Sequence, residues 1–222
     1  MLDERKNLLF QEMENPTRDL QELESPTIFK TAKIDRKREL RDLRRQQSAA
    51  EALEGFDQSV EIYGFTKGQF SVVDLFQEAI RIVGESDLVI STWTASPVDV
   101  KRVLEFSDSK QIKSAKWLFD HTFQNRSPGL AHEIRKVFGE ETIRIGQNHS
   151  KFFMLSNDKW KLICHSSMNL NLNPRFENFC IKHDPELFYF HQDIIDEIWA
   201  NQDKSLANKR PAEIKRFFKN KM

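Results

Sequence analysis

Cysteine and long apolar runs are scarce in this chain of 222 residues, which has only two cysteines. Cys164 and Cys180 both lie within apolar runs, as free thiols of a protein core do, and no metal-ligand spacing is present. No apolar stretch reaches the length of a membrane-spanning helix, and none follows the charged start of the chain. The expected compartment is therefore the cytoplasm.

The chain also lacks a net charge, because 34 basic residues balance 34 acidic ones, so the total says nothing about partners. Basic residues nevertheless gather near both chain ends, which favours a polyanion such as nucleic acid as a partner. Solvated faces of surface helices would give the same composition. Near the N-terminus, the candidate nucleic-acid-binding residues are Lys30, Lys33, Arg36, Lys37, Arg41, Arg44 and Arg45.

The first part of the chain contains no glycine before Gly55 and is dense in charge. In KIDRKRELRDLRRQQSAAEALEG, residues 33–55, acidic and basic side chains recur three or four residues apart. Asp35 is a candidate cap and Gly55 a stop signal, so the pattern predicts a helix. Its narrow apolar stripe suits docking on a partner better than forming a core. We expect a helical, charged arm over 1–55, a globular domain over 56–202 and a basic tail over 203–222.

From about residue 58, strand-like and helix-like segments alternate. Strands are expected over 59–65, 86–95, 112–123 and 141–146, and helices over 70–84, 96–108 and 127–139. Three more strand-like segments follow without helices between them, over 149–156, 159–168 and 177–183, and a helix over 185–202 closes the domain. This pattern predicts the α/β class: a layered α/β/α sandwich with a mixed, largely parallel sheet.

The stretch IGQNHSKFFML carries a histidine and a lysine among large apolar residues. Successive side chains of a strand alternate between its faces, so His149 and Lys151 would share one face. That face would hold a nucleophile beside a cation. Taken alone the pair is a weak signal, because a histidine of the core and a lysine that reaches out of a strand would give the same pattern.

Small polar residues follow in HSSMNLNLNPRFENF. Ser167 and Asn169 share one parity and would face the same side of a strand that pairs with the His149 strand. Polar donors beside a histidine and a lysine make a pocket for an oxyanion. The alternatives are a structural role for Ser167, a turn position for Asn169 and an ordinary surface carboxylate at Glu177.

The order of these groups resembles the signature of the phospholipase D superfamily. That signature is His-x-Lys-x4-Asp, then a Gly/Ser-Ser-x-Asn element, then a later acidic residue. The resemblance covers about residues 58–200 as a fold pattern and is specific over 148–179, where SSMNLNLNPRFENF is similar to a branch encoded in phages and prophages. The matching positions are His149, Lys151, Ser166, Ser167, Asn169 and Glu177.

The resemblance implies a phosphodiesterase that needs no metal and no other cofactor. One histidine attacks phosphorus to form a phosphohistidine, and a second protonates the leaving oxygen and later activates water. It assigns catalytic roles to His149, Lys151, Asn169 and Glu177, with Glu177 as the group that orients a histidine. Lys151, Ser167 and Asn169 would bind the phosphoryl group.

The chain departs from the signature at two points. Ser156 stands where the family's aspartate would come, and Asp158 lies two residues late. No other histidine begins a second His-x-Lys, so the chain carries one half-motif where the reaction needs two. Two copies would have to meet across a two-fold axis, and a homodimer is therefore expected.

Nucleic acid fits the basic segments better than lipid does, because phosphate contacts alone give sequence-independent binding. A membrane-docking helix with exposed aromatic residues is not evident. The expected function is a nuclease acting on DNA, in the bacterial host cytoplasm if the chain is phage-encoded. The alternative is a catalytically silent module that binds nucleic acid or assembles a phage DNA-handling or virion complex, with residues 1–55 docking it to the larger assembly.

Overall fold

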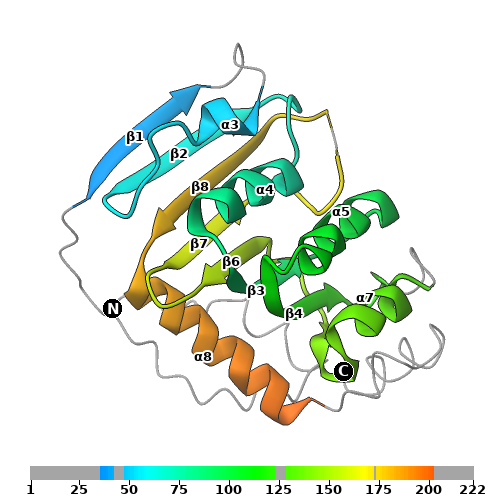
Figure 1. Cartoon of the computed structure of the whole chain (residues 1–222). Helices are drawn as coiled ribbons and strands as arrows, with labels where there is room; N and C mark the ends of the chain where they lie inside the picture. The colour runs from blue at the N-terminus through cyan, green and yellow to red at the C-terminus, as the bar shows by residue number, and fades with distance from the viewer. Residues whose placement is uncertain (1–35, 43–47, 124–128, 173, 203–222) are drawn as a thin grey trace, which may run out of the picture.

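The computed structural model describes residues 36–42, 48–123, 129–172 and 174–202 (Figure 1). The strands within these ranges are β1 (Lys37–Asp42), β2 (Val60–Thr66), β3 (Ser86–Thr92), β4 (Ile112–Asp120), β5 (Ile143–Gly146), β6 (Phe152–Ser156), β7 (Lys161–Ser166) and β8 (Glu177–His183). The helices are α3 (Ala49–Ala52), α4 (Val72–Val83), α5 (Pro97–Asp108), α7 (Leu130–Phe138) and α8 (Pro185–Asn201), with a 3-10 turn, η1 (Glu140–Thr142).

The described strands form one eight-stranded sheet in the order β1-β2-β8-β7-β6-β3-β4-β5. Pairing is parallel for β1 with β2, β3 with β4 and β4 with β5. It is antiparallel for β2 with β8, β8 with β7, β7 with β6 and β6 with β3. β6 and β8 therefore run against the other described strands, which confirms the expected mixed sheet, with three parallel and four antiparallel pairings.

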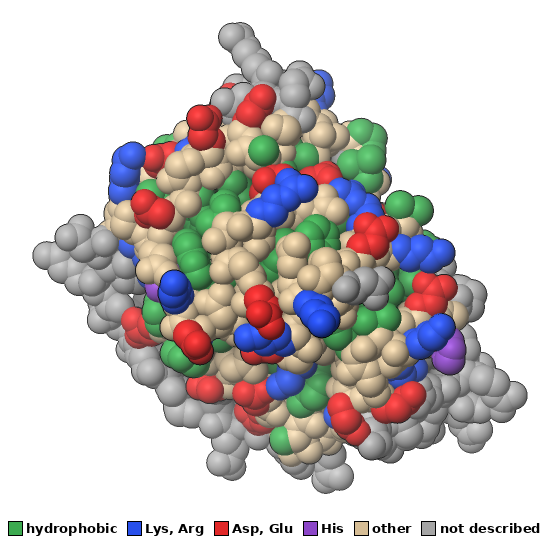
Figure 2. All heavy atoms as spheres, viewed as in Figure 1, with side chains coloured by type: hydrophobic (Ala, Val, Ile, Leu, Met, Phe, Trp, Pro, Cys, Tyr) green, Lys and Arg blue, Asp and Glu red, His purple; other side chains and the backbone are tan. Residues whose placement is uncertain are grey.

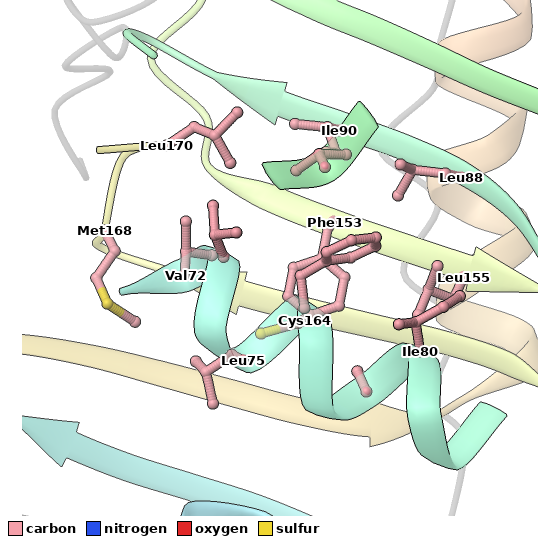
Figure 3. Close-up of a cluster of buried hydrophobic side chains, with 14 of the residues drawn as sticks. Val72, Leu75, Ile80, Leu88, Ile90, Phe153, Leu155, Cys164, Met168 and Leu170 are labelled. Carbon is pink, nitrogen blue, oxygen red and sulfur yellow. The ribbon is translucent and has the colours of Figure 1, made fainter. Parts of the chain in front are cut away.

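One face of the sheet packs against α3, α4, α5 and α7, and this layer holds the larger core. The α4 helix begins with a capping box between Ser71 and Asp74, and its apolar residues recur at helical spacing. Figure 3 shows its side chains gathered against β3, β6 and β7. The side chains labelled there include Val72, Leu75, Ile80, Leu88, Ile90, Phe153, Leu155 and Cys164.

The opposite face of the sheet packs against α8 through a second apolar cluster. Val89 of β3 belongs to this cluster, whereas its neighbours Leu88 and Ile90 belong to the first, so β3 is buried on both faces. The helix contributes Phe188 and Ile195. The three layers confirm the expected α/β/α arrangement. Among the described helices, none has the length and apolar composition needed to cross a membrane.

The helix expected over 33–55 is wrong for the residues that the structure describes there. Lys37–Asp42 is the strand β1, and α3 is a helix of only 4 residues. The physical reason is that the backbone of this segment pairs along β2, and tertiary pairing overrides a weak local preference. Residues 1–35, 43–47 and 203–222 lie outside the described residues, so the division into arm, domain and tail stays a prediction.

The strand directions bring several chain segments to one edge of the sheet, which we call the site edge. Thr66 at the end of β2 pairs with Glu177 at the start of β8, and Ser91 near the end of β3 pairs with Phe152 at the start of β6. The ends of β4 and β7 lie at the same edge. Residues that follow or precede these strand ends can therefore meet in space.

Candidate functional site

His149 and Lys151 lie at the site edge, in the segment that leads into β6. The strand begins at Phe152, so the two residues precede it rather than lying inside it as predicted. Their side chains nevertheless lie together, with Lys151 Nζ 3.3 Å from His149 Nδ1. The ammonium also donates a hydrogen bond to the His149 carbonyl oxygen at 2.7 Å. His149 is exposed and Lys151 is half-buried.

A second group joins the ends of β7 and β8 to this pair. The Ser166 amide donates to the Lys151 carbonyl oxygen at 3.1 Å. Ser167 Oγ donates to the Glu177 carboxylate, and it accepts a hydrogen bond from the Asn178 amide at 2.9 Å. β7 ends at Ser166, so Ser167 lies in the loop after the strand and not within it, as the parity argument assumed. Three strand ends are thus linked by short polar contacts.

The negative charge of Glu177 affects the pKa of Lys151. Partial burial lowers the pKa of the Lys151 ammonium below its ordinary value, and the nearby negative charge of Glu177 raises it in part. A cation that has lost part of its hydration attracts an anion more strongly than one in open water. The structure therefore brings His149, Lys151, Ser167 and Glu177 together.

Asn169 lies in the loop that follows Ser167. Within the part of the chain that the structure describes, its side-chain Oδ1 is buried and has no hydrogen-bond partner. The loop itself is held in place, because the Leu170 amide donates to Thr94 O at 3.2 Å and the Ser96 amide donates to Leu170 O at 2.8 Å. A buried polar atom without a partner costs about 1–3 kcal/mol. Such an atom is explained by a water, an ion or a bound group, or by stored strain.

A buried asparagine that the sequence analysis missed holds the His149 loop. Asn148 Nδ2 donates to Ser91 Oγ at 3.0 Å and to Leu118 O at 3.1 Å, and the Asn148 amide donates to Asp120 Oδ2 at 3.3 Å. These contacts tie the loop to the ends of β3 and β4. The sequence showed only that a polar residue stands directly before His149. Because Asn148 lies outside a strand, no periodic pattern marks it as buried.

Asp120 at the end of β4 anchors the same loop. Burial would raise the pKa of its carboxyl group, but hydrogen bonds from His121 and Thr122 lower the pKa below its ordinary value. His121 Nδ1 lies 3.2 Å from Asp120 Oδ2. The carboxylate therefore stays charged and available to the Asn148 amide, and it fixes a second histidine to the site edge.

Trp93 is a further neighbour of His149 that the sequence did not single out. It follows the end of β3, and its ring centroid lies 5.4 Å from that of His149 with an interplanar angle of 51°. An aromatic ring at this distance restricts the orientations of the imidazole. Its position after a buried strand was the only signal available.

Of the basic residues expected to bind nucleic acid, the structure describes Arg36, Lys37 and Arg41, and the first two lie away from the site edge, at the start of β1. Arg36 bonds to Asp184 at 2.8 Å at the opposite edge, where β8 ends. Lys37 pairs with Glu39 at 2.6 Å, and Arg41 pairs with the same carboxylate at 2.5 Å. The face covered by α4 and α5 shows acidic and basic side chains interspersed (Figure 2). The residues that lie outside the described ranges are Lys30, Lys33, Arg44 and Arg45.

The two cysteines are free thiols, as expected. Cys164 is buried and Cys180 is half-buried, and burial raises the pKa of both thiols above the ordinary value. In the ranges that the structure describes, no group of three or more histidine, cysteine or acidic residues is placed to hold a metal ion.

No protein-family model and no curated protein matches the chain. Solved structures resemble it in fold. A phospholipase D family member, Nuc from Salmonella typhimurium, is 17% identical with a TM-score of 0.47, over 63% of this chain and 93% of that one. NucT from Helicobacter pylori is 11% identical with a TM-score of 0.43, over 62% and 95%. Phosphatidylserine synthase from Haemophilus influenzae is 13% identical with a TM-score of 0.44, over 72% and 44%.

Proposed function

We propose that this chain, whose fold resembles that of the phospholipase D superfamily, is a metal-independent phosphodiesterase that acts on nucleic acid, with DNA as the substrate. If the chain is phage-encoded, it acts in the cytoplasm of the bacterial host. One observation carries the proposal: the exposed His149 and the half-buried Lys151 lie side by side at the site edge, where Ser167 and Glu177 are joined by a hydrogen bond.

In the proposed reaction, a ring nitrogen of His149 attacks phosphorus and the bond to the leaving oxygen breaks. A second histidine gives that oxygen its proton, and the same histidine later takes a proton from the water that hydrolyses the phosphohistidine. Lys151 and Asn169 hold the non-bridging oxygens, whose charge grows in the transition state. Ser167 adds a hydroxyl to this cradle.

The second histidine comes from a second copy of the chain, because the sequence has one His-x-Lys. Two copies related by a two-fold axis would each supply one half of the site. Glu177 would then orient the ring nitrogen of a histidine that does not react. The proposal thus includes a homodimer whose axis passes the site edge.

The serine that replaces the family's aspartate does not weaken the proposal. Ser156 ends β6 and pairs with Asp87 near the start of β3, at the edge opposite to the site edge. Lys151 directly precedes β6 and Ser156 ends it, so the whole strand, at about 3.3 Å per residue, lies between them. A side chain at that end cannot touch a phosphate held by His149.

The test uses the full chain, purified and incubated with plasmid and with single-stranded DNA in EDTA. We expect cleavage by the wild type and a loss of at least about a thousandfold in His149→Ala, because the nucleophile is removed. His132→Ala, at an exposed position of α7, is the matched control and should cleave as the wild type does.

Two results would contradict the proposal: no cleavage by the wild type, or unchanged cleavage by His149→Ala. Binding of DNA without cleavage would instead support the silent binding or assembly module. Mass spectrometry after reaction with a slow phosphodiester should find the covalent adduct on His149.

A further inference from the structure

An aromatic surface lies beside the site edge, on the sheet face that carries α8. Tyr63 pairs with Cys180, and Cys180 pairs with His165, which contacts α8 through His191. Opposite residues of neighbouring strands share a face, so Tyr63 and Phe65, two residues further along β2, point to this face. We call the group Leu40, Tyr63, Phe65 and Phe176 the aromatic surface.

The rings of the aromatic surface are arranged for further stacking. Phe65 and Phe176 lie nearly parallel, with centroids 5.1 Å apart and an interplanar angle of 14°. Tyr63 meets Phe65 edge-on, with centroids 5.4 Å apart. Phe176 is 61% exposed and Leu40 is 77% exposed. Together with Arg41 and Asp42 these side chains line a hollow of about 480 Å³, a volume within the range of small-ligand sites.

The aromatic surface is continuous with the candidate site. Phe176 directly precedes Glu177. The Glu177 carboxylate accepts a hydrogen bond from the Ser167 hydroxyl, and its charge raises the pKa of Lys151 in part. Phe65 pairs with Asn178, the residue after Glu177. A polymer whose phosphate is held at Lys151 would therefore meet these rings with its neighbouring units.

Bases of a single strand are the chemistry that this surface fits. Unstacked bases bind to exposed aromatic side chains through their flat faces, whereas a duplex keeps those faces inside its own stack. Arg41 borders the same hollow while its guanidinium donates to the Glu51 and Glu54 carbonyl oxygens, and Arg38 lies on the face of the rings with its side chain 67% exposed beside Glu61. Arginine next to aromatic rings is typical of surfaces that bind single-stranded nucleic acid.

We infer that the aromatic surface stacks the bases of a single-stranded nucleic acid and that single strands are the preferred substrate of the adjacent site. The claim that single strands are the preferred substrate rests on the proposed function. The claim that they bind rests on the aromatic surface alone. A second copy of this chain is the competing occupant, because an apolar surface of this kind can also form an interface.

The experiment measures binding of a fluorescent oligothymidine by anisotropy in the His149→Ala background, which prevents cleavage. Phe176→Leu keeps an apolar side chain but removes the stacking face, and it should weaken single-strand binding about fivefold to a hundredfold. Phe176→Trp should bind at least as well as the parent. Val98→Ala is the control, because it truncates an exposed apolar side chain on α5.

Duplex DNA of the same length should bind Phe176→Leu and its parent equally. Equal single-strand binding by the two proteins would overturn the inference, and so would an equal loss for duplex. Sedimentation of Leu40→Ala and Phe176→Leu provides another test. If both variants lose dimers while their binding of single strands is unchanged, the surface is an interface between copies and the inference fails.

Failure of the inference and failure of the proposed function give different results. If the wild type cleaves single strands and duplex alike, and Phe176→Leu changes neither rate, the proposed function stands and the inference is wrong. If the wild type cleaves nothing but binding of single strands depends on the ring at position 176, the proposed function is wrong and the binding surface stands.

Discussion

Two histidines share a single hydrogen bond between the sheet and α8. His165 Nε2 lies 2.9 Å from His191 Nε2, and His191 Nδ1 lies 2.9 Å from the Leu187 carbonyl oxygen. A carbonyl oxygen only accepts, so His191 carries its proton on Nδ1 and its Nε2 accepts from His165. Both rings are then neutral. Protonation of His191 at Nε2 would set two donors against each other, and the contact would then persist only with the His165 proton moved to Nδ1.

The pKa values of the pair predict a loss of stability in mild acid. Burial, with the charges of His191 and Lys182, lowers the pKa of His165 to about 4, and burial lowers that of His191 as well. The unfolded chain therefore binds more protons than the folded chain between about pH 6.5 and 4. The stability is present above pH 6.5 and is lost as the pH falls through this window.

Urea unfolding at a series of pH values measures this effect. His165→Gln should flatten the decline of the midpoint between about pH 6.5 and 4.5, because one of the two depressed histidines is gone. His132→Gln, on the exposed side of α7, should retain the decline of the wild type. A decline that is the same in all three proteins would show that this pair does not control acid stability.

Residue types carry the part of the site that could be predicted from sequence. His149, Lys151 and Glu177 were predicted because the chemistry of an imidazole, an ammonium and a carboxylate is known from the residue type alone. Asn148 and Trp93 were not, because Asn148 acts through hydrogen bonds to β3 and β4 and Trp93 through its contact with His149, and both depend on the pairing order of the sheet.

At the scale of elements, the packing of the Phe179 ring of β8 over β2 requires a glycine at position 64. A Cβ added to Gly64 would lie 2.5 Å from Phe179 Cζ, and Phe179 is fully buried in the core. Real Cβ atoms do not come that close to another heavy atom, so one strand or the ring would have to move. The glycine thus lets the ring fill the space against β2.

Gly64→Ala should destabilise the fold by about 1–3 kcal/mol, the usual cost of overpacking. Gly146→Ala is the matched control, because a Cβ there meets nothing within 4 Å, and it should be neutral. In a double-mutant cycle, Phe179→Leu should relieve part of the cost, which urea unfolding measures as coupling between the two sites. A Gly64→Ala protein as stable as the wild type would contradict the close approach.

Elements with strong local signals were predicted well, and β1 was not. The caps Ser71, Ser96 and Asp184 stand where three helices begin, and each accepts a hydrogen bond from a backbone amide of the first turn. β1 carries charges at helical spacing, yet charged side chains are also how an edge strand avoids unwanted pairing. Local composition cannot distinguish a charged helix from a charged edge strand, because pairing with a partner strand determines which of them forms.

At the scale of the whole molecule, the proposed dimer makes activity depend on the partner. If each site needs two His149 side chains, a wild-type chain paired with His149→Ala is inactive. A roughly ninefold excess of His149→Ala, allowed to exchange, should lower cleavage per wild-type chain about tenfold. The same excess of an unrelated protein should lower it little. If the cleavage rate per wild-type chain does not change when His149→Ala is in excess, a single chain is active without a partner.

The order of strands across the sheet also has a consequence for synthesis. β8 lies between β2 and β7, so the two early parts of the sheet stay separate until residues 177–183 have left the ribosome. Glu177 and the ring of Phe176 directly before it are made at the same stage. A nascent chain thus cannot assemble the candidate site until β8, the last of the described strands, has been made.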